Sequence, residues 1–209
     1  MNQQVSQQGV ITEQDVKSGR RHFIALTLVI GLPFAVALYL IYNLDVLEGI
    51  ATKNKGYLVQ PTREIPTLEF QTLDGGIFDT KSFQGTWTLL LAVDSQCDDG
   101  CQKNLFYQRQ IRLATGDDRS RVNRVTLLLD KEAIDSFAKK VEPFKTQVLI
   151  GPEASREALL KTLMIDDQPM HGRMFTIDPQ GRLVLGYDAN PAWKDVLHDL
   201  QHLLKVVQF

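Results

Sequence analysis

The chain has little cysteine and no excess of charge of either sign. Two cysteines among 209 residues exclude a framework of several disulfides, although they allow one redox pair or part of a metal site. Lys and Arg number 23 against 25 Asp and Glu, a net charge of −2, which argues against nucleic acid as a partner. With 44% hydrophobic and 23% charged residues, the composition indicates a globular protein rather than a disordered chain.

One long hydrophobic run lies near the N-terminus. Residues 23–42 carry no charged side chain. At about 1.5 Å of rise per residue, a helix of this length matches a bilayer core roughly 30 Å thick. We therefore predict a transmembrane helix over residues 22–43, preceded by a disordered cytoplasmic tail of residues 1–21. A cleaved signal peptide is the alternative, but its hydrophobic part usually spans about 7–15 residues, and no clear cleavage motif follows this run.

Positive charge is concentrated on the N-terminal side of the hydrophobic run. Lys17, Arg20 and Arg21 precede it, whereas the first charges after it are Asp45 and Glu48. Segments rich in Lys and Arg tend to stay in the cytoplasm. We therefore expect a single-pass protein with its N-terminus in the cytoplasm and its C-terminal part outside the membrane.

The rest of the sequence predicts one α/β domain. Residues 44–63 are expected to form a linker, and residues 64–209 are enough for one hydrophobic core and too few for two. Apolar runs and helical periodicity predict the secondary structure. Strands are predicted at 67–72, 77–79, 87–93, 122–129, 148–150, 173–177 and 183–187, and helices at 101–113, 133–141, 153–164 and 192–207. This alternation predicts a sheet with helices on both faces.

The two cysteines occupy the most informative position in the sequence. Cys97 and Cys101 follow the predicted buried strand and lie at the start of a helix, where unpaired N–H groups and the dipole stabilise a thiolate. At this spacing on a helix their Cβ atoms are about 5–6 Å apart, so the pair can form a disulfide or bind one metal ion. Two thiolates suit Cu(I) or Zn(II). A merely structural disulfide is the alternative.

Around these cysteines the chain resembles a known family. The membrane segment, the Cys-x-x-x-Cys motif at a helix start and the late Asp178-Pro-Gln-Gly181 turn are arranged as in the Sco-type (SCO/SenC) copper chaperones of cytochrome c oxidase assembly. Members of that family carry a membrane-anchored thioredoxin-like domain, with a central mixed β-sheet flanked by helices. The resemblance covers residues 60–209 in layout and implies the same fold here.

The resemblance also implies a copper site. Cys97 and Cys101 match the family's two cysteine ligands, although Asp98 stands where the family usually has Pro. Met170 occupies the position of the family's ligand histidine, and His171 follows one residue later. The implied ligands are therefore Cys97, Cys101 and His171, with Met170 as the alternative third ligand.

The function implied by the resemblance is the biogenesis of cytochrome c oxidase. The domain would lie in the periplasm, tethered to a bacterial inner membrane. It would deliver copper to the oxidase subunit with the binuclear copper site, or reduce the cysteines of that subunit; other assembly factors are further possible partners. Such a protein is a metallochaperone rather than an enzyme. One alternative is an enzyme, a membrane-tethered thiol–disulfide oxidoreductase without a metal. The other is a non-redox assembly scaffold with structural cysteines.

Overall fold

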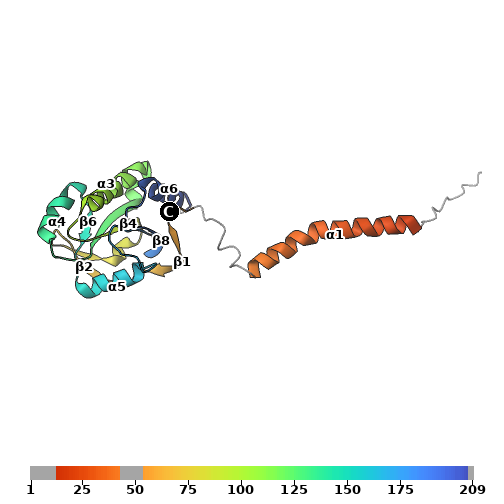
Figure 1. Cartoon of the computed structure of the whole chain (residues 1–209), viewed down its shortest axis with the longest axis horizontal. Helices are drawn as coiled ribbons and strands as arrows, with labels where there is room; N and C mark the ends of the chain where they lie inside the picture. Colours follow the sequence, from red (N-terminus) through yellow and green to blue (C-terminus); the bar gives the residue numbers. More distant parts are fainter. Residues whose placement is uncertain (1–12, 43–53, 207–209) are drawn as a thin grey trace, which may run out of the picture. The chain divides into compact units, whose positions relative to one another are not determined.

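The structure, a computed structural model, describes residues 13–42 and 54–206. The chain divides into two compact units, Met1–Thr52 and Lys53–Phe209. The first unit contains one long helix, and the second contains the α/β domain (Figure 1).

The N-terminal helix is longer than its hydrophobic part. Helix α1 spans Glu13–Tyr42, and its segment Arg21–Tyr42, with a mean hydropathy of 2.5, is long and apolar enough to cross a membrane. The predicted disordered tail is therefore wrong for residues 13–21, because polar helix-forming residues continue the backbone hydrogen bonding that the apolar segment establishes. Residues 1–12 and 43–53 lie outside the described part of the chain.

The domain is built on a six-stranded mixed sheet. Strand order is β1-β8-β7-β4-β5-β6, in which β4, β5 and β6 run parallel and the β4–β7, β7–β8 and β8–β1 pairs are antiparallel. The strands are β1 (Tyr57–Glu64), β4 (Trp87–Val93), β5 (Val122–Leu128), β6 (Gln147–Leu149), β7 (Met174–Ile177) and β8 (Arg182–Tyr187). The predicted hairpin is also present, as a separate sheet of β2 (Glu69–Gln71) and β3 (Ile77–Asp79).

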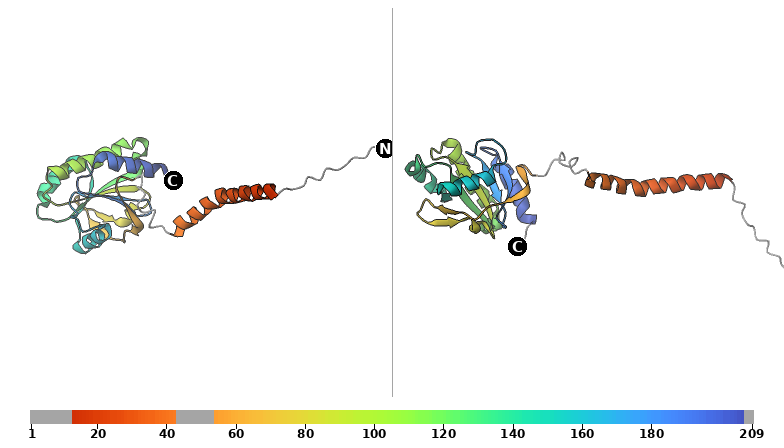
Figure 2. Two further views of the ribbon diagram at one scale, coloured as in Figure 1. Left: turned by 45° about the vertical axis from the view of Figure 1, so that its right-hand side comes forward. Right: turned by 90° about the horizontal axis from the view of Figure 1, so that it is seen from below.

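Helices cover both faces of the sheet, as predicted. The helices of the domain are α3 (Asp99–Ala114), α4 (Ile134–Val141), α5 (Glu153–Leu163) and α6 (Trp193–Val206). Side chains of α3, α4 and α6 belong to one hydrophobic cluster, and α5 joins the β2–β3 hairpin in a second cluster. Figures 1 and 2 show α3 and α6 side by side over one face and α5 over the other.

Strand β4 connects the two hydrophobic clusters. All seven of its residues are buried. Because side chains alternate along a strand, Leu89 and Leu91 pack in the α3–α6 cluster, whereas Leu90 and Ala92 pack in the α5 cluster. A continuous apolar run is thus what a strand covered on both faces requires.

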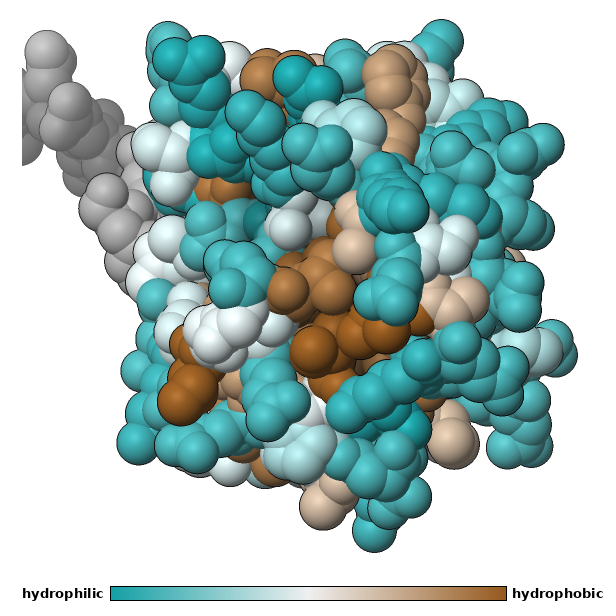
Figure 3. Space-filling view, turned by 90° about the vertical axis from the view of Figure 1, so that its left-hand side faces the viewer, coloured by the Kyte–Doolittle hydropathy of each residue, from teal (hydrophilic) through white to brown (hydrophobic). Residues whose placement is uncertain are grey.

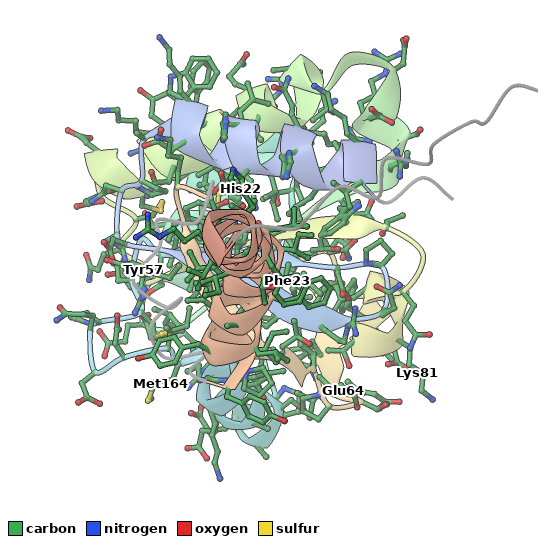
Figure 4. All side chains as sticks on the ribbon, turned by 90° about the vertical axis from the view of Figure 1, so that its right-hand side faces the viewer. His22, Phe23, Tyr57, Glu64, Lys81 and Met164 are labelled. Carbon is green, nitrogen blue, oxygen red and sulfur yellow. A yellow bond between two sulfur atoms is a disulfide. The ribbon has the colours of Figure 1, made fainter. Side chains whose placement is uncertain are left out.

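The domain begins earlier than the sequence predicts. Residues 57–63, expected in the linker, form most of strand β1, which pairs with β8 at the edge of the sheet. Val59 is the one buried side chain of this strand, and Tyr57 and Glu64 are exposed at its two ends (Figure 4). The linker prediction is wrong here because an edge strand this exposed has no alternation of apolar and polar residues to detect.

An apolar hollow lies on the side of the domain that carries α4 and β6 (Figure 3). Its volume is about 380 Å³, and Leu73, Val141 and Val148 contribute to its lining. Neither Cys97 nor Cys101 lines this hollow, so it is separate from the candidate site described next.

Candidate functional site

The two cysteines are joined in a disulfide at the carboxyl end of β4. Cys97 lies in the loop after the strand, and Cys101 lies in the first turn of α3, with their Cα atoms 5.0 Å apart. Both side chains are almost completely buried in the α3–α6 cluster. Helix α3 starts at this point because the Asp98 side chain caps it, with Oδ1 accepting a hydrogen bond from the Cys101 N–H at 2.8 Å.

Cys97 has an unusual backbone conformation that its neighbours maintain. Its φ of +40° lies in the left-handed region, which non-glycine residues rarely adopt. The Asp94 carboxylate accepts a hydrogen bond from its N–H at 3.1 Å. The Lys140 ammonium donates to its carbonyl oxygen at 3.0 Å and to that of Gln96 at 2.6 Å. The loop is therefore held by Asp94, which directly follows β4, and by Lys140 on α4.

His171 lies beside this loop although it is 74 residues after Cys97 in the chain. Its Nδ1 is 2.9 Å from Oδ2 of Asp94, and its Nε2 is 3.9 Å from Oδ1 of Asp98. The second distance is too long for a hydrogen bond. That same Asp98 oxygen, however, accepts the hydrogen bond from the Cys101 N–H that caps α3. The imidazole is one-third exposed and hence accessible to a partner.

A tight turn places His171 and directs Met170 elsewhere. The N–H of Arg173 donates to the carbonyl of Met170 at 3.2 Å, and Gly172 occupies the third position with φ +78°, as a type II turn requires. Met170 packs against the α5 cluster, on the opposite face of the sheet from the cysteines. The structure thus brings His171 to Asp94 and Asp98, in the segment that contains Cys97, and does not bring the alternative ligand Met170 there.

Hydrogen bonds of Ser95 hold the cysteine loop against the end of β5. The Ser95 hydroxyl and N–H both bind the Asp130 carboxylate, and the Ala133 N–H donates to the Ser95 hydroxyl at 2.9 Å. Burial raises the pKa of Asp130, but hydrogen bonds from Ser95 and Glu132 more than offset it, so the pKa lies below the usual value. Asp130 is therefore a charged anchor at neutral pH.

The fit of this site to a metal ion depends on the state of its two cysteines. In the part of the chain that the structure describes, no three His, Cys, Asp or Glu side chains are grouped as ligands. The donor types still fit a soft ion, because reducing the disulfide would give two thiolates in the segment that the His171 imidazole contacts through Asp94. Because the thiolate is the form of cysteine that binds a metal, binding at these two sulfurs would follow reduction of the disulfide.

Sequence reasoning missed two of the residues that organise this site. Asp94 directly follows the buried strand, a position that favours a role at the sheet edge, so its location was a usable signal. Lys140 lies on α4 and reaches Cys97 only because α4 packs beside the loop. Nothing in the local sequence around Lys140 indicates that contact.

Comparison with known proteins places the chain in a family. No curated protein sequence matches it. Residues 87–207, more than half of the chain, match the family described as "Transmembrane-like, thioredoxin-like, C-terminal domain". The chain belongs to this thioredoxin-like family. The matched region includes both cysteines, Asp94 and His171.

Solved structures share the thioredoxin-like fold. Copper-bound ScoI from Bradyrhizobium japonicum has a TM-score of 0.52 and 18% identity, covering 66% of this chain and 98% of that one. Apo Sco1 from Thermus thermophilus has a TM-score of 0.56 and 21% identity, covering 75% and 100%. The thioredoxin domain of a thiol-disulfide oxidoreductase from Bacteroides vulgatus has a TM-score of 0.53 and 16% identity, covering 73% and 99%.

These similarities confirm the predicted fold. These neighbours of the thioredoxin-like protein include two Sco proteins, one of them with copper bound, and a thiol-disulfide oxidoreductase, and all three are below 25% identical to it. Similarity at that level concerns the fold, and the site must carry any functional argument.

Proposed function

We propose that this thioredoxin-like protein is a membrane-anchored, Sco-like copper chaperone for cytochrome c oxidase. The observation that supports it best is the position of His171 beside the loop and helix start that contain both cysteines. Two thiolates and one imidazole form a ligand set for Cu(I), which prefers soft donors. The copper-bound neighbour ScoI shares the fold.

The first step is reduction of the Cys97–Cys101 disulfide. A thiolate of a partner dithiol attacks one sulfur, the S–S bond breaks, and the other cysteine leaves as a thiolate. The second thiolate of the partner then attacks the partner's own sulfur in the mixed disulfide, and the cysteine of this protein leaves as a thiolate. The partner is thereby oxidised to a disulfide, and Cys97 and Cys101 remain as two thiolates.

The second step is the transfer of copper as cargo. Cu(I) binds the two thiolates with His171 as the third ligand, and it stays in the same oxidation state throughout. Cysteines of the oxidase subunit with the binuclear copper site then replace these ligands one at a time. Alternatively, the reduced pair gives its two electrons to a disulfide in that subunit, so that the subunit can bind copper.

A Cu(I) competition titration of the reduced, detergent-solubilised full chain tests the copper site. We expect one tightly bound equivalent, which Cys97→Ser abolishes and His171→Ala weakens by at least about tenfold. Met170→Ala is the matched control, because Met170 is adjacent in sequence but packs on the other face of the sheet. Absence of tight binding by the reduced wild-type protein would refute the chaperone proposal.

The closed disulfide supports a second candidate, a membrane-tethered thiol–disulfide oxidoreductase without a metal. That function predicts exchange with a partner disulfide that does not depend on copper and continues in His171→Ala. A scaffold role predicts that the double Cys97→Ser, Cys101→Ser variant still supports oxidase assembly. Complementation of an assembly-deficient strain with these variants separates the three functions.

We further propose that α1 anchors the domain in a bacterial inner membrane, with the domain in the periplasm. Length and hydropathy of Arg21–Tyr42 support the anchor, and the positive charges before it support the orientation. A reporter fused after residue 209 that is active only in the periplasm tests both. An active cytoplasmic reporter at the same position would reverse the orientation.

A further inference from the structure

An apolar groove of about 510 Å³ lies on the surface of α3, next to the start of α6. It is lined by Phe106, Tyr107, Gln110, Leu113, Ala114 and Trp193. Two of its apolar side chains are almost half exposed, Phe106 at 46% and Leu113 at 48%. Figures 1 and 2 show the two helices side by side on the face of the sheet away from α5. The groove contains neither cysteine, so it is separate from the candidate site.

The packing of the domain does not require this groove. Helix α3 already buries one stripe of side chains, which consists of Cys101, Asn104, Leu105, Gln108 and Ile111. Phe106 and Leu113 are seven residues apart, nearly two turns, and so share a different side of the helix. The rings of Tyr107 and Trp193 stack with their centroids 6.3 Å apart and join the two helices at the groove. An exposed apolar surface of this kind, rimmed by polar residues, is typical of an interaction site.

The rim of the groove is basic. The Lys103 ammonium is 5.6 Å from the centre of the Tyr107 ring, and the Lys194 ammonium is 5.9 Å from the centre of the Trp193 ring. Arg109 is a further exposed cation on α3, whereas the one acidic residue of that helix lies in its first turn. Aromatic rings and positive charge therefore occur together here, and the complementary partner is anionic on its surface and apolar beneath it.

We propose that this groove docks the domain onto the surface of an anionic phospholipid bilayer. Trp and Tyr rings gather at the headgroup level of membranes, where neighbouring Lys side chains extend their ammonium groups toward lipid phosphates. The inference rests on the proposed membrane anchor, because only residues 43–53 then separate the bilayer from the described part of the domain. A chain of that length reaches at most about 40 Å. The tether thus keeps the groove at a high effective concentration of lipid.

Charge disfavours a second copy of the chain as the occupant. A two-fold contact uses the same surface of both copies, so two basic rims would meet and repel each other. A protein with an acidic, apolar segment also has the complementary chemistry, but only the bilayer is kept close to the domain by the tether. That second occupant is therefore an outcome of the test rather than the proposal.

The fluorescence of Trp193 reports contact with lipid directly. The full chain is reconstituted into vesicles of phosphatidylcholine, with or without added phosphatidylglycerol, whose acyl chains are brominated near the headgroup. The chain has two tryptophans, and Trp87 is buried, so Trp193→Phe supplies the background. We expect quenching of the Trp193 emission to be at least about twofold stronger in the anionic vesicles and to decline as salt is added. Absence of Trp193 quenching in both kinds of vesicle would overturn the proposal.

A paired substitution at the rim tests the role of charge. Lys103→Gln with Lys194→Gln removes two cations beside the groove. Lys81→Gln with Lys161→Gln is the matched control, because it removes two exposed cations that do not line the groove. We expect the rim variant to lose at least about half of the quenching that depends on anionic lipid, and the control to retain it. Equal losses in the two variants would assign the effect to net charge and refute docking through the groove.

A second pair of variants tests the apolar contact. Phe106→Asn with Leu113→Asn makes the exposed part of the groove polar while leaving the buried stripe of α3 intact. Ile77→Asn is the control, since Ile77 is an exposed apolar side chain of the β2–β3 hairpin. We expect the quenching of Trp193 to fall in the groove variant and to stay at the wild-type level in the control. Wild-type quenching in the groove variant would contradict an apolar contact with lipid.

Flotation of the vesicles after a high-salt wash separates this inference from the proposed anchor. A chain that stays with the vesicles is held by α1, because salt removes contacts that depend on charge. If the chain is retained and Trp193 is not quenched, docking fails, the anchor stands, and an acidic protein segment becomes the candidate occupant of the groove. If the chain is washed off but Trp193 is quenched in anionic vesicles at low salt, the anchor fails and lipid binding by the groove stands.

Discussion

The side-chain amide of Asn104 donates a hydrogen bond to the backbone carbonyl of Gly172 at 3.2 Å. This contact joins the helix that contains Cys101 to the turn that contains His171. The same amide nitrogen donates to Oδ1 of Asn190 at 3.0 Å, and Asn104 is almost completely buried. The two halves of the candidate site are therefore connected by one buried side chain.

Asn104→Ala should destabilise the domain and loosen the His171 turn. The substitution removes one of the two donors to the Gly172 carbonyl, which keeps the hydrogen bond from the Asn190 N–H at 3.2 Å, and the loss of one such hydrogen bond costs about 0.5–1.5 kcal/mol. Urea unfolding measures the loss, and amide hydrogen exchange of Gly172 and its neighbours should become faster. Asn123→Ala is the control, because Asn123 makes an exposed hydrogen bond to Thr86 and its loss should change stability by less than about 0.5 kcal/mol. Equal losses for the two variants would contradict the prediction.

Asp98→Ala should weaken α3 at its first turn. The Asp98 side chain caps the helix, and removing such a cap typically costs about 1 kcal/mol. Asp98→Asn should retain most of this stability because asparagine is an equally good cap. Thermal and urea unfolding of the oxidised protein check both variants. If the two substitutions were equally destabilising, the carboxylate charge would matter more than the capping hydrogen bond.

Lys140→Met should make the disulfide easier to reduce. Both cysteines are buried, so a reductant reaches them only when the loop opens. Lys140 restrains that loop through the carbonyls of Gln96 and Cys97. We expect reduction by excess dithiothreitol to become several-fold faster, whereas the exposed neighbour Lys139→Met should reduce at the wild-type rate. An unchanged rate in Lys140→Met would show that these hydrogen bonds do not limit opening.

Stability should fall at alkaline pH through Tyr187. Burial raises the pKa of Tyr187 far above its usual value, and the charge of Asp199 and the hydrogen bond to it at 3.1 Å raise it further. The unfolded chain ionises this phenol near pH 10, while the folded chain keeps it neutral. Its contribution is therefore fully present below about pH 10 and is lost as the pH rises further, by about 1.4 kcal/mol per unit.

Urea unfolding at a series of alkaline pH values measures this dependence. Tyr187→Phe should reduce the slope. Tyr57→Phe is the control, because the pKa of Tyr57 is also raised, through its hydrogen bond to Asp188, but its side chain is half exposed. A slope that is unchanged in Tyr187→Phe would assign the alkaline loss to other groups.

Contacts of Asp199 explain why the sequence did not predict that the domain begins before residue 64. This buried carboxylate on α6 accepts hydrogen bonds from the backbone N–H groups of Lys55 and Gly56, at 2.8–3.0 Å, and from the Tyr187 hydroxyl. The partners at Lys55 and Gly56 are more than 140 residues away in the chain. Residues with no periodic pattern of their own are thus fixed just before β1 by a distant side chain.

The cysteine site shows a similar division. The position of Cys97 and Cys101 after a buried strand and at a helix start could be predicted, because local patterns specify both elements. The choice between Met170 and His171 could not, because it depends on the turn that Gly172 closes and on which face of the sheet each side chain meets. Met170 and His171 are adjacent in the sequence, yet Met170 packs against the α5 cluster and His171 contacts Asp94 at the cysteine loop.

The sequence by itself determined the elements whose signal is local. Apolar runs specified α1 and the buried strand β4, turn residues specified the β2–β3 hairpin, and amphipathic periodicity specified α6. Only the tertiary structure placed His171 against Asp94 and Lys140 against the carbonyl of Cys97. Hydrophobic patterning reports which side chains leave water, but polar contacts between distant segments form only after the strands and helices have packed, and they leave no periodic trace in the chain.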